Sequence, residues 1–249
     1  MIKILVIAPK GKMGKMIVKV AAESSDIKIV GGLGPEGRDY IGRDIGLASG
    51  LGYEVGALVY SDIEEIIDSC DVVVDFSTVE LSIKVLEACI GHKKAFICGT
   101  TGFSPEQETK IKSAGKTIPV LKAANTSYLV NLMKRLLGIA ASSLGEKAKI
   151  EIIDYHDQKK LDAPSGTAKE LGAEMAAAAS KDPEEIAYHS VRAGDISSTH
   201  TVIFGLMGER MEISHISYNW ECFARGAIDA VRYLKGRSPG LYTMEDVIS

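Results

Sequence analysis

Short runs of β-branched and aliphatic residues alternate with helix-like segments along roughly the first 120 residues, and this alternation constrains the fold more than any other feature. The runs have strand length and are mainly apolar, which is typical of strands buried on both faces of a sheet. Strands are predicted at 2–8, 27–32, 57–60, 72–76, 95–98 and 118–121. Helices are predicted at 15–25, 63–69, 81–90 and 105–114. The alternation predicts an α/β chain with a doubly wound parallel sheet.

The pattern changes in the second half of the chain. Three strand-like segments follow one another without intervening helices, at 187–191, 198–206 and 209–217. Such a run predicts a second, mixed or antiparallel sheet. A further strand is expected at 149–155, and helices at 129–144, 165–179 and 223–234. We therefore predict two domains, with the boundary near 125–131.

Composition and charge exclude several classes of protein. The net charge is −4 and the pI is about 5.8, which gives no basic field for nucleic acid. The four cysteines are scattered without metal-ligand spacing, so we expect reduced core thiols and no metal site. The chain starts with a short strand-like run, and no segment approaches the length of a membrane span. These features predict a cytoplasmic protein that binds neither nucleic acid nor membranes.

The loop after the first predicted strand reads Ala-Pro-Lys-Gly-Lys-Met-Gly, residues 8–14. A dinucleotide site needs glycines where the backbone turns tightly and approaches the phosphates at a helix start. Gly11 and Gly14 meet this need, while Ala8 stands where the first glycine is usual. The pattern therefore indicates a pyrophosphate loop. A tight strand-to-helix turn with solvated lysines has the same pattern and stays open.

The end of the second predicted strand bears on the choice of cofactor. NAD-preferring sites carry an acidic residue there, which accepts hydrogen bonds from the ribose diol. Gly34 occupies that position in this chain, and Glu36 is displaced from it. Lys10, Lys12 and Arg38 add positive charge nearby, which favours a 2′-phosphate and hence NADPH over NADH.

The segment 151–172 places several protonatable groups next to a glycine-containing helix start. A strand runs into His156, Asp157 and two lysines, and then into Pro-Ser-Gly-Thr at the start of a helix. Free N–H groups and the positive dipole end of a helix attract anions. His156 can change its charge near neutral pH, and Lys160 supplies a compact positive charge. The segment indicates an anion site with an acid beside it, although a polar loop before an ordinary helix cap would also fit.

Several motifs together resemble the 4-hydroxy-tetrahydrodipicolinate reductase (dihydrodipicolinate reductase) family. They are GTTGF at 99–103, DAPSGTA at 162–168, RAGDI at 192–196 and GERMEISH at 208–215, and the likeness extends over essentially the whole chain. The resemblance implies a Rossmann dinucleotide-binding domain, residues 1–127 plus 225–249. It implies a mixed α+β domain, 128–224, that binds substrate and assembles a homotetramer. The implied reaction reduces a cyclic dicarboxylate with NADPH or NADH in lysine and diaminopimelate biosynthesis.

The resemblance also implies roles for individual residues. His156 matches the general-acid histidine and Lys160 the catalytic lysine. Substrate contacts are expected from Asp157, Ser165, Gly166 and Thr167. Cofactor contacts are expected from Ala8, Pro9, Lys10, Gly11, Lys12, Met13, Gly34, Arg38, Phe76, Gly99, Thr100, Thr101, Ala123, Ala124, Asn125 and Thr126.

Four positions depart from the family pattern. Asp157 replaces a second histidine, Thr126 replaces an aromatic residue, and Ala8 and Gly34 lie in the cofactor loops. Two other functions therefore stay open. One is an NAD(P)H-dependent reductase of another cyclic imine or enamine acid, and the other is a dinucleotide-binding homologue without turnover.

Overall fold

The computed structural model describes residues 1–249, which form two compact units. Unit 1 comprises Met1–Ser127 together with Glu221–Ser249, and unit 2 comprises Tyr128–Trp220. The chain therefore leaves unit 1 once and returns to it with its last segment.

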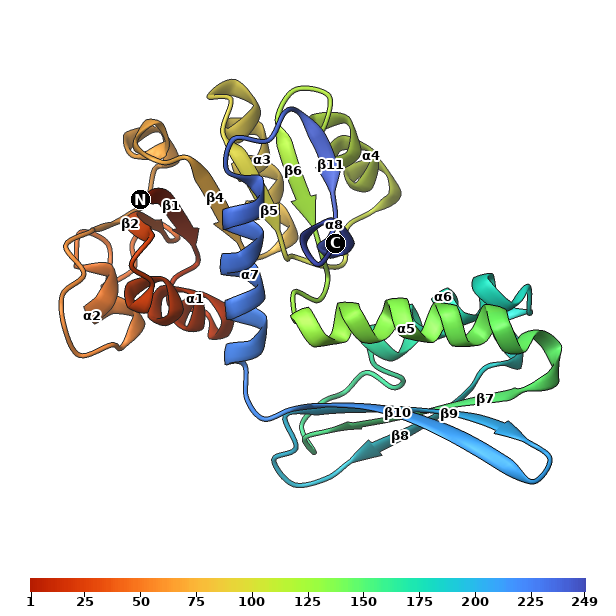
Figure 1. The fold of residues 1–249 in the computed structure, drawn as a ribbon. Helices are drawn as coiled ribbons and strands as arrows, with labels where there is room; N and C mark the ends of the chain where they lie inside the picture. Colours follow the sequence, from red (N-terminus) through yellow and green to blue (C-terminus); the bar gives the residue numbers. More distant parts are fainter. The chain divides into compact units, whose positions relative to one another are not determined.

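Unit 1 contains a seven-stranded sheet in the order β11-β6-β5-β4-β1-β2-β3 (Figure 1). All its strand pairs are parallel. The strands are β1 (Ile2–Ile7), β2 (Ile27–Leu33), β3 (Val59–Tyr60), β4 (Val72–Asp75), β5 (Ala95–Cys98), β6 (Pro119–Lys122) and β11 (Gly240–Tyr242). The doubly wound parallel sheet that the alternation predicted is confirmed.

Helices cover both faces of this sheet, which explains why β1 is continuously apolar from Ile4 to Ile7. Ile4 and Val6 face a core formed with α1 (Lys12–Glu23) and α7 (Glu221–Leu234), which lie side by side in Figure 1. Leu5 and Ile7 face a second core formed with α3 (Val79–Gly91) and α4 (Pro105–Ala114). None of these four side chains is exposed, as expected for a central parallel strand.

Three parts of unit 1 differ from the sequence prediction. The helix expected at 63–69 is a pair of short 3₁₀ turns, Ile63–Glu65 and Ile67–Ser69, because Ile66 between them adopts φ −132° and ψ −21°, outside the helical region. The C-terminal tail contains β11, which pairs with β6, and a last short helix, α8 (Met244–Val247). A short helix α2 (Ile45–Ser49) was also not predicted.

Unit 2 contains a four-stranded sheet in the order β10-β9-β7-β8. The β7–β8 pair is parallel and the other two pairs are antiparallel, so the predicted mixed sheet is confirmed. Its strands are β7 (Lys149–His156), β8 (Ala187–Arg192), β9 (Ser198–Leu206) and β10 (Glu209–Ser217). Two helices, α5 (Tyr128–Leu144) and α6 (Gly166–Ala179), pack on one face of this sheet around Leu137, Leu171 and Phe204.

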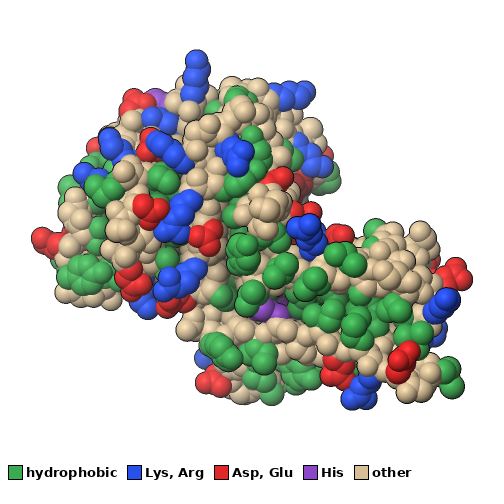
Figure 2. Space-filling model, in the orientation of Figure 1, with side chains coloured by type: hydrophobic (Ala, Val, Ile, Leu, Met, Phe, Trp, Pro, Cys, Tyr) green, Lys and Arg blue, Asp and Glu red, His purple; other side chains and the backbone are tan.

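The opposite side of α5 carries apolar residues that unit 2 does not bury. Leu129 is 60%, Leu136 46% and Ile139 58% exposed. Hydrophobic side chains gather over this helix on the face drawn in Figure 2. Each helix is either too short or too polar to span a lipid bilayer.

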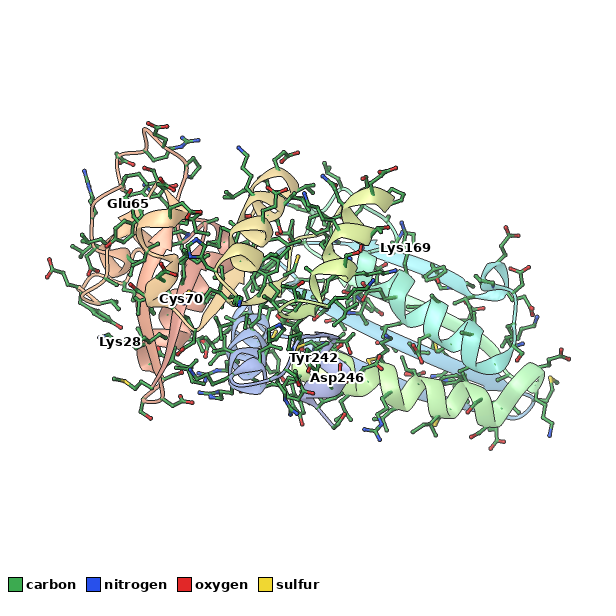
Figure 3. All side chains as sticks on the ribbon, turned by 90° about the horizontal axis from the view of Figure 1, so that it is seen from above. Lys28, Glu65, Cys70, Lys169, Tyr242 and Asp246 are labelled. Atoms are coloured by element: carbon green, nitrogen blue, oxygen red, sulfur yellow. The ribbon has the colours of Figure 1, made fainter.

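The four cysteines are all free thiols, as expected from their spacing. Cys70, labelled in Figure 3, donates a hydrogen bond to the Ile67 carbonyl at 3.2 Å. Burial raises the pKa of the Cys70 thiol to about 12 and that of Cys98 to about 11. These thiols therefore stay protonated at neutral pH and contribute packing rather than reactivity.

Candidate active site

The predicted cofactor residues of unit 1 gather at one edge of its sheet. β1, β4, β5 and β6 are parallel neighbours, so their carboxyl ends lie at the same edge. The strand order reverses at β1, from which β2 and β3 continue in one direction and β4, β5 and β6 in the other. Open α/β sheets bind their ligands at such a switch point.

The loop between β1 and α1 is shaped for close approach of an anion. Ala8 adopts a left-handed φ of 53°, and the Gly11 N–H donates to the Ala8 carbonyl at 2.9 Å. A Cβ on Gly14 would lie 2.1 Å from that carbonyl oxygen, so this position requires glycine. α1 begins without a capping side chain and without acidic residues in its first turn. These features fit the pyrophosphate of a dinucleotide.

The turns after β4 and β5 are locked together. A Cβ on Gly99 would lie 2.1 Å from the Phe76 ring, so the ring packs directly on the glycine backbone. Thr100 donates from Oγ1 to the Asp75 carboxylate at 3.2 Å and accepts the Ser77 N–H at 3.0 Å. Burial raises the pKa of Asp75. Phe76, Gly99 and Thr100 therefore form one rigid surface at the sheet edge.

The end of β2 has no room for a side chain at Gly34. A Cβ there would lie 2.6 Å from the Tyr40 ring, which fills the space that an acidic side chain occupies in NAD-preferring sites, and the contact of Gly34 with a cofactor stays a prediction. Lys10 lies 4.9 Å from the centre of that ring. A pocket of about 840 Å³ beside them is lined by Lys10, Tyr40 and Arg43, among others, but not by Arg38. Arg43 is a further basic residue on this side that the sequence analysis did not single out, and contact of Arg38 with a cofactor stays a prediction.

The segment after β6 is anchored from within unit 1. Thr126 is 1% exposed, and its hydroxyl donates to the Phe223 carbonyl at 2.7 Å. Asn125 accepts the Ser127 N–H on its side-chain oxygen at 2.9 Å. The Thr126 hydroxyl therefore fixes the segment Ala123–Thr126 against the start of α7. Its own contact with a cofactor stays a prediction.

His156 ends β7 with its side chain 11% exposed. Its Nδ1 lies 3.4 Å from Asp154 Oδ2 without hydrogen-bond geometry, and this nitrogen is buried without a hydrogen-bond partner. Burial lowers the pKa of His156, and Lys160 lowers it further, while Asp154 opposes the shift. The imidazole is therefore neutral at pH 7 in the free protein, and an anion bound beside it would favour protonation.

Lys160 and Asp157 lie in the loop that follows. The Lys160 ammonium lies 2.8 Å from Asp162 Oδ1, with its side chain 26% exposed. Asp157 accepts the Lys159 N–H on Oδ1 at 2.8 Å, and its carbonyl accepts the Lys160 N–H. Asp157 thus shapes the turn that presents Lys160, and its contact with a substrate stays a prediction.

The start of α6 is open to an anion. Ser165 is the N-cap and accepts the Ala168 N–H on Oγ at 3.1 Å. The first turn of the helix contains no acidic side chain. A Cβ on Gly166 would meet no atom within 4 Å, so the space over the helix start is clear. The positive dipole end of α6, with Gly166 and Thr167 at its start, therefore faces an open position.

Asp154 joins these parts, although the sequence did not single it out. It is 1% exposed and accepts hydrogen bonds from the Ser165 N–H at 3.0 Å, Ser190 Oγ at 2.5 Å and Arg192 Nη2 at 3.0 Å. Arg192 also donates to the Asp162 carbonyl at 2.7 Å. Arg192 is the first residue of the RAGDI motif. The motif therefore pointed to Arg192, but the sequence analysis assigned this residue no part in the site.

One cluster in unit 2 has the composition of a metal site. Ligand atoms of Asp154, His156 and His200 lie within 4.8 Å of one another, and carboxylate and imidazole groups suit several divalent metals. Both oxygens of Asp154 already accept hydrogen bonds, one of them from the cationic Arg192. Nε2 of His200 is hydrogen-bonded with Ser165. The cluster is therefore arranged as a hydrogen-bond network, and the charge of Arg192 opposes a cation there.

Fold and site together define a class. Unit 1 has the Rossmann-like sheet and glycine loop of a dinucleotide-binding oxidoreductase, and unit 2 combines an anion site with a titratable imidazole. Comparison with known families makes this specific. Residues 2–126 match the model described as dihydrodipicolinate reductase, N-terminus, and residues 129–248 match the corresponding C-terminus. The chain belongs to the dihydrodipicolinate reductase family.

Individual relatives agree with this assignment. The 4-hydroxy-tetrahydrodipicolinate reductases of Geobacter metallireducens and Syntrophotalea carbinolica are 39% and 38% identical, over 100% of this chain and 99% of theirs. A solved structure, dipicolinate-bound dihydrodipicolinate reductase from Paenisporosarcina sp. TG-14, has a TM-score of 0.84 at 23% identity and covers 100% of both chains. The last comparison supports the fold, and the first two confirm the family resemblance.

Proposed function

We propose that the chain reduces 4-hydroxy-tetrahydrodipicolinate to tetrahydrodipicolinate in lysine and diaminopimelate biosynthesis. The reaction takes up one hydride and one proton and releases one water molecule. NADPH or NADH supplies the hydride when bound. The observation that carries the proposal is the open start of α6, which hydrogen bonds of Asp154 and Arg192 connect to the loop of Lys160, with the buried His156 imidazole next to Asp154. The name shared by the curated relatives supports the same reaction.

In this proposal unit 2 binds and protonates the substrate. The N–H groups of Gly166 and Thr167 receive one carboxylate, because the first turn of α6 has a positive dipole end and no acidic side chain. Lys160 exchanges its Asp162 partner for substrate charge. The negative charge that develops on the substrate as hydride arrives is quenched by a proton from His156 Nε2, since Nδ1 is buried beside Asp154. Substrate carboxylates raise the pKa of His156 and so supply the protonated form when it is needed.

Unit 1 provides the cofactor half of the reaction. The backbone of Ala8–Met13 would hold the pyrophosphate at the start of α1, which lacks a capping side chain. Phe76 and the Gly99–Thr101 turn would form the wall beside the nicotinamide. Their mutual packing fixes this wall before any ligand binds, which reduces the entropy lost on binding.

The test is turnover at 340 nm with purified protein, enzymatically generated substrate, and NADPH or NADH. We expect turnover in the wild type, and a loss of about two orders of magnitude in kcat or more for H156A and K160A. Lys159→Ala is the matched control. It removes the same charge from the neighbouring residue, whose side chain is exposed. Turnover only with other cyclic imines would favour a related reductase, and cofactor binding without turnover would favour a non-catalytic homologue.

The quaternary state is a separate part of the proposal. We propose a homotetramer assembled through the sheet of unit 2, as the family resemblance implies. The face of this sheet away from α5 and α6 carries Val191 and Ile216, which are 36% and 56% exposed, with Tyr155 between them in the register. Light scattering should give the mass of four chains, and I216E should give a smaller species. We also propose a cytoplasmic location, consistent with the four free thiols.

A further inference from the structure

His200 is a buried titratable group that the mechanism above does not use. It lies on β9 opposite Asp154 of β7 and His215 of β10, on the face of the sheet that packs against the helices. It is 1% exposed. Its Nε2 lies 3.2 Å from Ser165 Oγ, and its ring lies edge-on to His156 with centroids 5.4 Å apart. His200 therefore touches both the anion site and the proposed acid.

The tautomer of His200 follows from what surrounds each nitrogen. Nδ1 is buried and has no hydrogen-bond partner. Burial lowers the pKa of His200 to about 4, so the ring is neutral and carries one proton. An unpaired buried N–H donor is rarer and more costly than an unpaired lone pair. The proton therefore belongs on Nε2, which donates to Ser165 Oγ.

This tautomer determines what the Ser165 hydroxyl can do. Its oxygen accepts the Ala168 N–H at 3.1 Å and, on this assignment, the His200 Nε2–H at 3.2 Å. Both lone pairs are then used, and the hydroxyl proton is left to be donated. The space over the neighbouring Gly166 is clear. Because Ser165 is only 2% exposed, the acceptor must sit directly on the helix start, where little water competes.

We propose that His200 is a positioning residue, which turns Ser165 into a hydrogen-bond donor for the substrate carboxylate held at the start of α6. The inference rests on the proposed function for the identity of that carboxylate. Without His200, the Ser165 proton is free to rotate inward, and the carboxylate loses a donor. Ser165 would then still cap the helix, so the fold and the cofactor site would be unaffected.

The experiment uses the full-length protein and pyridine-2,6-dicarboxylate as the probe, with its Kd measured by calorimetry. The amide nitrogen of Gln reaches the position of His Nε2, whereas that of Asn reaches only Nδ1. We therefore expect H200N to weaken binding about tenfold or more, the scale of one hydrogen bond to a charged group, and H200Q to retain most of the affinity. The same weakening should appear in KM for the substrate, with a smaller change in kcat.

A double-mutant cycle separates this role from simple destabilisation. S165A should weaken the probe as much as H200N, and S165A/H200N should be no weaker than S165A alone, because both changes remove one donor. His215→Asn is the control, since His215 is buried on the next strand and forms no hydrogen bond with Ser165. Unchanged Kd values for the cofactor would show that unit 1 is intact in each variant.

Two results would overturn the inference. The first is wild-type affinity for the probe in H200N. The second is a fold loss of affinity in S165A/H200N that equals the product of the fold losses in the two single variants. If H200N does not fold, H200Q decides, because weak probe binding by a folded H200Q would contradict donation from Nε2. A wild-type protein that neither binds the probe nor turns over substrate would instead refute the proposed function.

Discussion

Asp154→Asn should destabilise unit 2 strongly, although the Asp and Asn side chains differ in one atom and have nearly the same size and shape. The carboxylate is 1% exposed and accepts three hydrogen bonds, from the Ser165 N–H, Ser190 Oγ and Arg192 Nη2. The Asn side chain carries an NH2 group in place of one of the two acceptor oxygens. This NH2 group must then face at least one of the three groups that donate to Asp154. It also leaves the Arg192 guanidinium, 16% exposed, without its counter-charge. Breaking a buried pair in this way costs about 3 to 5 kcal/mol, partly offset because Arg192 keeps its carbonyl acceptors. We expect a net loss of about 3 kcal/mol.

Urea unfolding followed by the fluorescence of Trp220 measures this loss. Trp220 is the only tryptophan of the chain and the last residue of unit 2, so its signal reports on that unit. With a urea m value of about 1 to 3 kcal/mol/M, the midpoint should fall by about 1 to 3 M. Glu151→Gln is the control on the same strand. Glu151 pairs with the exposed His189, and an exposed pair of this kind contributes under about 1 kcal/mol to stability.

The pH dependence of this difference provides a second check. Burial acts to raise the pKa of Asp154, but the hydrogen bonds from Ser190, the Ser165 N–H and Arg192 outweigh it and lower the pKa below its ordinary value. The carboxylate therefore stabilises the fold above its unfolded pKa, and this contribution disappears as pH falls through the lower folded value. The gap between wild type and D154N should be full at pH 7 and should shrink below about pH 4. A midpoint for D154N equal to that of E151Q at pH 7 would refute the reasoning.

Three further predictions concern the reaction and the fold. The fall of kcat/KM at alkaline pH should occur at a lower pH than the fall of kcat. The reason is that burial lowers the pKa of His156 in the free protein, whereas bound carboxylates raise it. Superimposed pH profiles of kcat/KM and kcat would contradict this. Lys10→Ala should raise KM for NADPH more than for NADH, with Lys28→Ala on β2 (Figure 3) as control, and equal losses would count against a 2′-phosphate contact. Gly226→Ala should lower the melting temperature, since its Cβ would lie 1.7 Å from a backbone oxygen, whereas Gly91→Ala meets no atom and should be tolerated.

The strands of unit 1 could be predicted where the chain is buried on both faces. β1, β4 and β5 each contain an uninterrupted run of at least three buried apolar residues, and such runs have few other structures open to them. β11 could not be predicted in the same way. Its three residues, Gly240–Tyr242, have no periodicity, and they become a strand only because β6 offers unpaired N–H and C=O groups at the sheet edge.

The candidate cofactor segments were predictable for a geometric reason. Each follows a strand, and parallel strands place their carboxyl ends together, so a sequence order of strand and loop becomes a spatial cluster. The positions of side chains within the cluster were not predictable. Gly34 lacks an acidic side chain because Tyr40, six residues later, packs against it, and no local pattern reveals that contact.

The residues that the sequence did not reveal in unit 2 share one property. β7 buries every second residue, Ile150, Ile152, Asp154 and His156, so the two polar residues occupy positions where the strand pattern calls for apolar ones. β9 does the same with His200, which stands in line with Val202 and Phe204. A buried polar group without partners is costly, so such positions persist only where a network satisfies them. Reading strand alternation for its violations would have pointed to Asp154 and His200, because the conflict between pattern and polarity is itself the signal of a site.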